Sequence, residues 1–398
     1  MEENKNRTTE VLNTGKIIIE IIKAQLTGGE YSLPVNCDYK KLFKMAEMHK
    51  VTSLIAGAVV NDENAPDNVK DIFKKELFKA SMRYSAQEKE REELSHIFSD
   101  NGIKFCFLKG YKVSRYYPEP ELRFMLDMDV FVEESKIAQA EEIVKGRGYV
   151  LNTFGDDKDI GYIKKPFLNI EIHKDLKYDY DKGFTYYKGA FERLTQGELP
   201  GEMHMTNEDF YVYILSHTAH HFQTSGTGIK NVLDHFILKD KLLPECKANE
   251  LYTALETVGL TEFSKRMDAL SDYWFNGGKC DDDILEMAEY VLLSGVFGNE
   301  TNNYLSGILR GEYKESRLSY LLHRAFPPLN QMKVRYKILC RFPVLLPIMW
   351  IVRLFAFTGS KTTVSSEMNT INSVDDAKKR QFEAFMGKNG LQNSKKLL

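Results

Sequence analysis

The chain has 398 residues, of which 43% are hydrophobic and 28% are charged, and its formal net charge is −3. This composition predicts a soluble globular protein, and the length is sufficient for two or three compact units. The nearly balanced charge gives no support for a general polyanion-binding role, so we expect no nucleic-acid partner.

The cysteines are scattered and odd in number, and none belongs to a Cys-x-x-Cys pair: Cys37, Cys106, Cys246, Cys280 and Cys340. This pattern excludes a disulfide framework and a zinc knuckle, and it predicts free thiols in a reducing compartment. The beginning of the chain, MEENKNRTTE, is polar and lacks the apolar segment of a signal peptide. We therefore expect a cytoplasmic protein.

Residues 1–100 carry apolar side chains at helical spacing, which predicts an N-terminal helical segment. The predicted helices are Thr14–Leu26, Asp38–Val59 and about Val69–Asp100. The third helix is long and charged, and Asn101-Gly102 marks its end.

From Ile103 the pattern changes to short strands with brief helices between them. The predicted strands are Ile103–Leu108, the residues from Asp127 to Val132, Tyr149–Phe154, Gly161–Lys165 and Leu168–His173. The last strand alternates most regularly between apolar and polar residues. One helix is predicted around Val113 and Tyr116, and another is expected to be capped by Ser135 and to end near Lys145. A single small mixed sheet accounts for this region.

Beyond Asn207 the helical pattern returns. The predicted helices are Glu208–Phe222, Lys230–Leu242, Ala248–Val258, Thr261–Phe275, Asp282–Ser294 and Tyr313–Ala325. The tail from Thr358 is polar, and we expect it to be partly disordered. The predicted fold class is α+β, with an N-terminal helical segment (1–100), a mixed-sheet core (101–200), a helical domain (201–330), and an apolar helix with a polar tail (331–398).

The most apolar stretch is Phe342–Phe357, which falls short of the ~20 residues of a membrane span and is interrupted by Arg353. We predict that it forms a buried or partly buried helix. The second interpretation is a peripheral contact with a membrane surface, to which the basic residues just before the stretch would contribute.

Asp127 and Asp129 lie one residue apart at the start of an apolar strand. Side chains alternate along a strand, so both carboxylates point the same way. Glu171, on the regular strand, joins them if the two strands are neighbours. We predict that the three carboxylates are catalytic and hold one Mg²⁺ or a pair, as phosphoryl and nucleotidyl transfer require. A solvated strand start without a metal is the alternative.

Lys109 and Gly110 end the preceding strand where a helix begins, and backbone N–H groups at such a position face an anion. We predict that they bind a phosphate together with Arg123, which lies in the connector that follows. The alternatives are an ordinary strand-to-helix turn and an ion pair of Arg123 with Glu119 or Glu121.

His217 and His221 share one face of a predicted helix at the i, i+4 spacing of some zinc ligands. The helix lacks a His-Glu-x-x-His motif, and Asp234-His235 reverses the doublet of HD-type phosphohydrolases. We therefore predict that both histidines line a cleft and contact substrate or phosphate; a histidine-based metal-dependent phosphohydrolase is the alternative. His173, beside the third carboxylate, is a further candidate for this binding set and would support the metal ligands.

Four motifs in this order resemble a known family: Phe-Leu-Lys-Gly (107–110), Tyr-Tyr-Pro-x-Pro-x-Leu-Arg (116–123), Asp-x-Asp-Val-Phe-Val (127–132) and Ile-Glu-Ile-His (170–173). They are similar to the bacterial family described as uncharacterised nucleotidyltransferases, within the DNA polymerase beta nucleotidyltransferase superfamily. The resemblance is closest from Ile103 to Leu176 and weaker at Asp38–Gly57 and Leu215–Phe222.

The resemblance implies a nucleotidyltransferase core and Mg²⁺-dependent transfer of a nucleoside monophosphate from an NTP such as ATP to a hydroxyl of an unidentified acceptor. Asp127 and Asp129 match the family's metal-binding Asp-x-Asp, and Glu171 matches its third carboxylate. Lys109-Gly110 stands where the wider superfamily has a Gly-Gly or Gly-Ser phosphate loop and a shorter run to the aspartates. A catalytically silent nucleotide- or partner-binding protein with the same fold is therefore the alternative.

Overall fold

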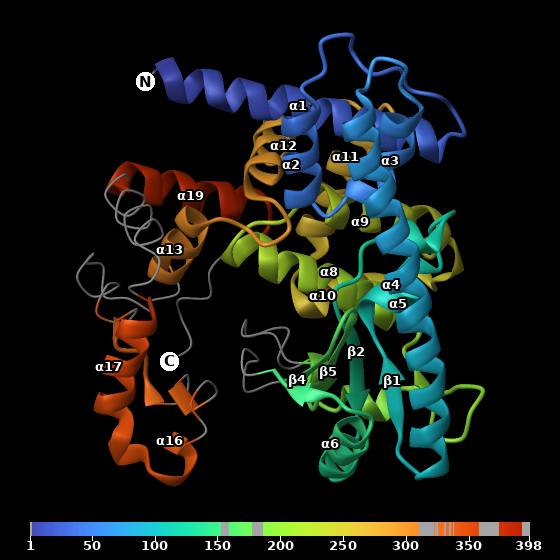
Figure 1. Cartoon of the computed structure of the whole chain (residues 1–398), viewed down its shortest axis with the longest axis vertical. Helices are drawn as coiled ribbons and strands as arrows, with labels where there is room; N and C mark the ends of the chain where they lie inside the picture. Colours follow the sequence, from blue (N-terminus) through green and yellow to red (C-terminus); the bar gives the residue numbers. More distant parts are fainter. Residues whose placement is uncertain are drawn as a thin grey trace.

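The computed structural model describes residues 2–152, 159–176, 186–309, 322, 325–329, 332–333, 336, 338–357 and 374–391. Figure 1 shows a sheet with one long helix beside it and most of the other helices gathered at one end. The predicted helix Tyr313–Ala325 and the far end of the predicted strand Tyr149–Phe154 lie largely outside the described residues.

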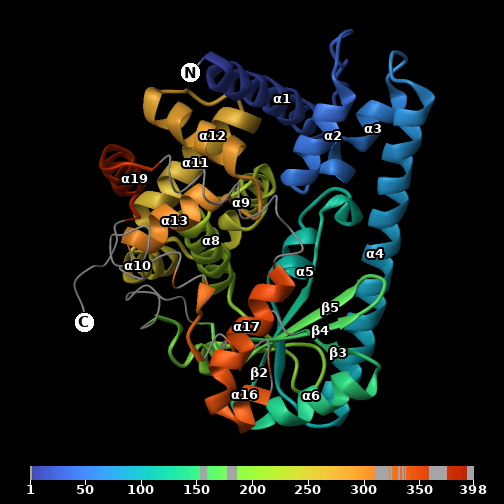
Figure 2. The same ribbon diagram turned by 60° about the vertical axis from the view of Figure 1, so that its left-hand side comes forward.

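The N-terminal part consists of α1 (Glu2–Leu26), α2 (Tyr39–Met48), α3 (Thr52–Asn61) and α4 (Asp67–Asp100). The prediction of one helix over Asp38–Val59 is wrong, because the chain turns between α2 and α3, where Lys50 adopts a left-handed backbone with φ 55°. The long helix α4 is confirmed; it packs against α3 and runs along the sheet, where it contacts β5 (Figure 2).

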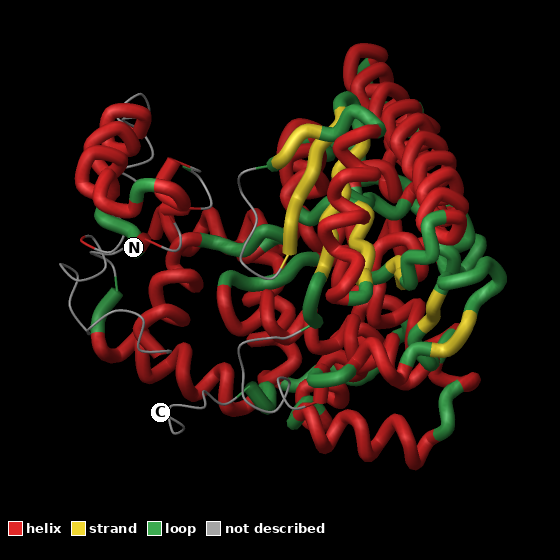
Figure 3. The backbone as a smooth tube through the Cα atoms, turned by 90° about the horizontal axis from the view of Figure 1, so that it is seen from below, coloured by secondary structure: helices red, strands yellow, loops and turns green. Residues whose placement is uncertain are grey.

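The core sheet has five strands in the spatial order β1–β2–β5–β4–β3. They are β1 (Phe105–Phe107), β2 (Met128–Val132), β3 (Val150–Leu151), β4 (Asp159–Lys164) and β5 (Leu168–His173), and β6 (Thr195–Gln196) pairs separately with β7 (Met203–His204). β2 and β5 are parallel and the other neighbours are antiparallel, which confirms the predicted mixed sheet and α+β class. Figure 3 shows these strands together, with helices around them.

Short elements connect the strands: α5 (Lys109–Ser114), the 3₁₀ turns η1 (Pro120–Leu122) and η2 (Glu134–Lys136), and α6 (Ile137–Gly146). The expectation that Ser135 caps a helix is wrong. Ser135 lies inside η2, where the Lys136 N–H donates to the Glu133 carbonyl (2.9 Å), and α6 begins after Lys136 without a side-chain cap. The start of α6 therefore depends on backbone hydrogen bonds and not on a capping side chain.

The helical part consists of η3 (Ala190–Arg193), α8 (Asn207–Thr224), α9 (Ile229–Lys241), η4 (Leu243–Glu245), α10 (Ala248–Val258), α11 (Thr261–Phe275), α12 (Asp282–Ser294) and α13 (Glu300–Leu309). α10, α11 and α12 have the predicted bounds. Helices α1, α8, α9, α11 and α12 share one apolar core, and the sheet shares a second one with α4 and α6. The division into four domains stays a prediction.

The buried imidazole of His49 ties the start of α9 to the N-terminal helices. Its Nδ1 accepts a hydrogen bond from the Ile229 backbone N–H (3.1 Å), so Nε2 carries the proton and donates to the Leu292 carbonyl (3.2 Å). Burial lowers the pKa of His49 to about 4, because the charged ring would lose its hydration. The folded protein therefore holds this ring neutral.

We expect the free energy of unfolding to fall as the pH is lowered from about 6.5 to about 4. In this window the unfolded state binds a proton at His49 and the folded state does not, so stability rises with pH, by up to about 3 kcal/mol. Urea unfolding of the wild type and of His49→Gln at a series of pH values measures this contribution. The variant should show a shallower pH dependence, and an unchanged slope would contradict the role of His49.

The tail that we expect to be partly disordered contains an ordered stretch, residues 374–391. They include α19 (Asp376–Lys388), whose Phe382, Phe385 and Met386 are buried. The Phe385 ring stacks on Phe222 of α8, with the centroids 5.8 Å apart. A few apolar residues on one helix face are sufficient to dock this segment.

The prediction of a buried or partly buried helix over Phe342–Phe357 is confirmed for Leu346–Phe357, which is helical and partly buried, with Met349 and Trp350 half-buried. After α16 (Ile338–Arg341), the stretch forms η5 (Pro343–Leu345) and the helix α17 (Leu346–Phe357). Large apolar side chains of this segment face solvent, including Val344 at 81% and Ile348 at 56% exposure. Within the described parts of the chain, no helix is both long enough and apolar enough to span a bilayer.

Candidate active site

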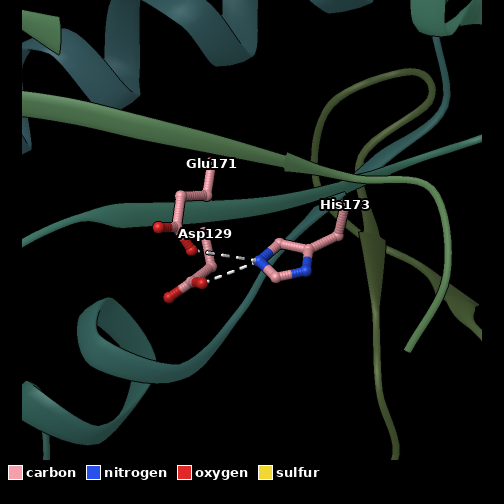
Figure 4. Close-up of side chains that lie close together, drawn as sticks. All are labelled: Asp129, Glu171 and His173. Carbon is pink, nitrogen blue, oxygen red and sulfur yellow. Dashed lines mark hydrogen bonds and ion pairs between the residues drawn. The ribbon is translucent and has the colours of Figure 1, made fainter. Parts of the chain in front are cut away.

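The parallel pairing of β2 with β5 brings two of the predicted carboxylates together. Asp129 lies directly opposite Glu171, and His173 follows two residues further along β5. Their neighbours on both strands are buried in the core shared with α4 and α6: Val130, Val132, Ile170 and Ile172. Because strand side chains alternate, Asp129, Glu171 and His173 lie together on the other face (Figure 4).

Asp129 is the centre of this cluster. Its Oδ1 accepts hydrogen bonds from His173 Nε2 (2.8 Å) and Lys109 Nζ (2.9 Å), and His173 Nε2 lies 3.8 Å from Glu171 Oε2. One ligand atom from each of Asp129, Glu171 and His173 lies within 4.8 Å of the others. Two carboxylates with an imidazole suit a divalent cation, and carboxylate oxygens are the donors that Mg²⁺ prefers. The two carboxylates therefore fit the predicted Mg²⁺, whereas His173 Nε2 donates to Asp129.

Asp127 lies beside this cluster but is not part of it. It precedes the first residue of β2, and it lines the same cavity as the cluster. Burial, followed by the negative charge of Asp129, raises the pKa of Asp127 to about 6. Burial also opposes the charge of Asp129, but Lys109 and His173 outweigh it and hold the pKa of Asp129 well below its usual range. The metal role of Asp127 stays a prediction.

The cluster forms part of one wall of a cavity of about 390 Å³. This volume lies within the range of ~300–1,000 Å³ that is typical of small-molecule sites. The cavity is lined by every predicted site residue: Lys109, Gly110, Arg123, Asp127, Asp129, Glu171, His173, His217 and His221. Stretches that are distant in the sequence therefore meet at one place, while the individual roles of these residues stay predictions.

The opposite wall comes mainly from α8 and α9. His217 Nε2 lies 3.2 Å from His221 Nε2, and the two rings meet edge to face. Burial, then the charge of Lys109, holds the pKa of His217 well below its usual value, and burial lowers the pKa of His221 to about 3. Both rings are therefore neutral at pH 7. The described residues offer this pair no third ligand of the kind that a zinc site needs.

The comparison with known families agrees with this geometry. Residues 36–276 match the model of a family described as uncharacterised nucleotidyltransferases, a match that covers more than half of the chain and includes the sheet, α5, α8 and α9. The chain belongs to this family. The predicted resemblance to the uncharacterised nucleotidyltransferases is thereby confirmed. No curated protein matches the chain.

In this member of the family, Arg123 has a partner that neither sequence interpretation named. Its buried guanidinium forms a bidentate pair with Asp234 of α9, with Nε–Oδ1 at 2.7 Å and Nη2–Oδ2 at 2.8 Å. Its Nη1 donates to the Gly110 carbonyl (3.0 Å). Tyr117 and Lys230 also donate to the Asp234 carboxylate, at 2.7 and 3.1 Å. The alternative of an ion pair within its own connector is wrong, because the guanidinium is engaged by α9.

This network changes the role that we assign to Arg123. Its planar fork is matched to Asp234, so we revise it from a phosphate ligand to a residue that holds the Lys109-Gly110 turn against α9. Burial opposes the charge of Asp234, but Arg123 and Lys230 hold its pKa well below the usual range. The i, i+4 spacing of Lys230 and Asp234 was a signal for an ion pair. The partner 111 residues away had no local signal.

Two aromatic rings at the cavity were missed by the sequence reasoning. Phe124 and Phe297 line it, and Lys50 Nζ lies 5.2 and 5.4 Å from their ring centroids. Arg83 lies over the Phe124 ring at 4.6 Å, and Phe297 is 63% exposed. Flat apolar faces beside cations suit a planar, negatively charged ligand. The sequence pattern around Phe297 gives no indication of this position.

Proposed function

We propose that the protein transfers a nucleoside monophosphate from an NTP to a hydroxyl of an acceptor. The observation that carries the proposal is the pairing of Asp129 with Glu171 beside His173, on the wall of a cavity in a member of a nucleotidyltransferase family. In-line attack of the hydroxyl on the α-phosphate would form the new P–O bond as the bond to pyrophosphate breaks.

The sheet wall supplies the chemistry in this proposal. Asp129 and Glu171 would hold one Mg²⁺ or a pair, and Asp127 would complete the set of oxygen ligands. An ion held there would supply charge neutralisation for the triphosphate and a lower pKa for the attacking hydroxyl. His173 donates to Asp129 and so orients its carboxylate. Lys109 reaches the same face on a flexible stem and would neutralise phosphate charge.

The helical wall would position the substrates. Neutral His217 and His221 can each donate or accept one hydrogen bond, which suits a phosphate oxygen or an acceptor hydroxyl. Phe297 lines the cavity and is 63% exposed, so it offers a flat face on which a nucleobase would stack. Stacking depends little on the identity of the base, so we expect a weak preference among the four NTPs.

Isothermal titration calorimetry with each NTP, with and without Mg²⁺, tests the first step of this proposal. We expect Mg²⁺-dependent NTP binding that is weakened by Glu171→Gln, because the variant loses a charged ligand. Glu192→Gln, at an exposed position of η3, is the matched control and should bind as the wild type does. Mg²⁺-independent binding that Glu171→Gln leaves unchanged would refute the metal site. Release of pyrophosphate from labelled NTP with candidate acceptors then measures transfer.

One contact favours the catalytically silent alternative. The Lys109 ammonium lies 2.9 Å from Asp129 Oδ1, beside the carboxylate that the ion would use. If this lysine replaces the ion, Lys109→Met should increase Mg²⁺ affinity and leave NTP binding largely intact. If it binds phosphate, as we propose, the same variant should weaken NTP binding.

A further inference from the structure

A second feature of the molecule lies outside the cavity, in the segment α16–η5–α17. Figure 1 shows this segment on the side of the molecule away from α4. Trp350 anchors its inner side, since Nε1 donates to the Pro327 carbonyl (2.8 Å) and the ring packs edge to face on Phe326 at 5.3 Å. The helix α17 is therefore held in place from one side.

The outward side of this segment is aliphatic. Val344, Ile348, Ile351 and Val352 are 81%, 56%, 55% and 45% exposed, respectively. Their spacing of four, three and one residues places them along one face of the segment. A continuous row of branched aliphatic side chains in water is unfavourable, and in soluble proteins such a patch marks an interaction site.

The stretch of sequence that contains this face carries charges of a single sign. From Ser316 to Ser366 the sequence contains no Asp or Glu, although the whole chain carries a net charge of −3. The same stretch contains these basic residues: Arg317, Arg324, Lys333, Arg335, Lys337, Arg341, Arg353 and Lys361. Among the described ones, Arg341 lies just before the aliphatic face and is exposed. The segment is thus apolar and carries two basic residues and no acidic one, in a chain whose charge is nearly balanced.

We propose that the outward face of α17 binds the surface of an anionic lipid bilayer. Val344, Ile348, Ile351 and Val352 would enter the boundary between headgroups and acyl chains, with Arg341 at the lipid phosphates. α17 has 12 residues, so it would lie in the plane of the membrane and not cross it. A second copy of the chain is a less suitable occupant, because its segment carries the same positive charge.

Co-sedimentation of the full chain with vesicles tests this proposal. We expect binding to phosphatidylcholine vesicles that contain phosphatidylserine, little binding to phosphatidylcholine alone, and weaker binding at high salt. Ile348→Glu/Ile351→Glu should reduce the bound fraction at least ~10-fold, because it removes two apolar anchors and adds two negative charges. Ile72→Glu, on the exposed side of α4 (45% exposed), is the matched control and should bind as the wild type does.

Three outcomes would overturn the proposal. The wild type does not bind the anionic vesicles; the double variant binds them as well as the wild type does; or sedimentation without vesicles shows an oligomer that the double variant dissociates. The last result would assign the face to contacts between chains. Thermal unfolding of each variant verifies that the fold is retained, which is expected because both isoleucines are exposed.

Discussion

Replacement of Asp129 by asparagine is expected to reduce nucleotidyl transfer by on the order of 10³-fold or more. Asparagine keeps the shape of the side chain but removes its negative charge. Lys109 and His173 both donate to this carboxylate, which would hold the ion together with Glu171. A bound ion contributes several kcal/mol of transition-state stabilisation, and each 1.36 kcal/mol is a factor of ten in rate. Release of pyrophosphate from labelled NTP under saturating Mg²⁺ measures the effect.

Asp240→Asn is the matched control for this substitution. Asp240 lies on α9, is 60% exposed and pairs with its neighbour Lys241, so its loss should leave transfer unchanged. Asp127→Asn answers a different question, namely whether the residue before β2 completes the metal site. Equal losses in Asp127→Asn and Asp129→Asn would support the Asp-x-Asp pair. Full activity in Asp129→Asn would show that the cluster is not the catalytic centre.

Replacement of Arg123 by methionine is expected to lower the free energy of unfolding by about 3–5 kcal/mol. The substitution leaves the Asp234 carboxylate buried without its bidentate partner, and it removes the hydrogen bond to the Gly110 carbonyl. Lys230 and Tyr117 continue to donate to Asp234, which limits the loss. Urea unfolding monitored by circular dichroism measures the change.

The exposed pair Arg193–Asp209 provides the control, since its arginine side chain is 38% exposed. Arg193→Met should cost about 0–1 kcal/mol, as expected for a solvent-screened pair. The double variant Arg123→Met/Asp234→Leu should recover part of the stability, because it removes both buried charges. If Arg123→Met left stability unchanged and weakened only NTP binding, Arg123 would be a phosphate ligand after all.

Local alternation was sufficient to predict β5, one of the two strands that carry the cluster. Leu168–His173 alternates without interruption, and β5 has those bounds. The two-residue period of a strand predicted that Asp129 and Glu171 lie on one face if their strands are neighbours. The structure was needed to show that β2 and β5 are neighbours. The prediction was less accurate at element ends, as Ser135 shows, because backbone hydrogen bonds decide where a turn becomes a helix.

The sequence alone could not predict which distant residues form contacts or whether the apolar face of a helix is buried. Arg123 could have paired with any nearby acid, and its choice of Asp234 depends on how α9 packs against the connector. The composition of Phe342–Phe357 predicts a helix, but apolar residues give the same pattern whether they face a core or solvent. The docking of α19 likewise depends on Phe222, which is distant in sequence from Phe385.

The two walls of the cavity differ in how far a substitution can alter their shape. The backbones of β2 and β5 are fixed to each other by a hydrogen-bonded ladder, whereas Tyr213, His217 and His220 come from successive turns of α8. Under the function that we propose, a substitution on α8 would reshape the space for the acceptor without displacing the ligands of the ion. These α8 positions are therefore where an engineered change of acceptor should begin.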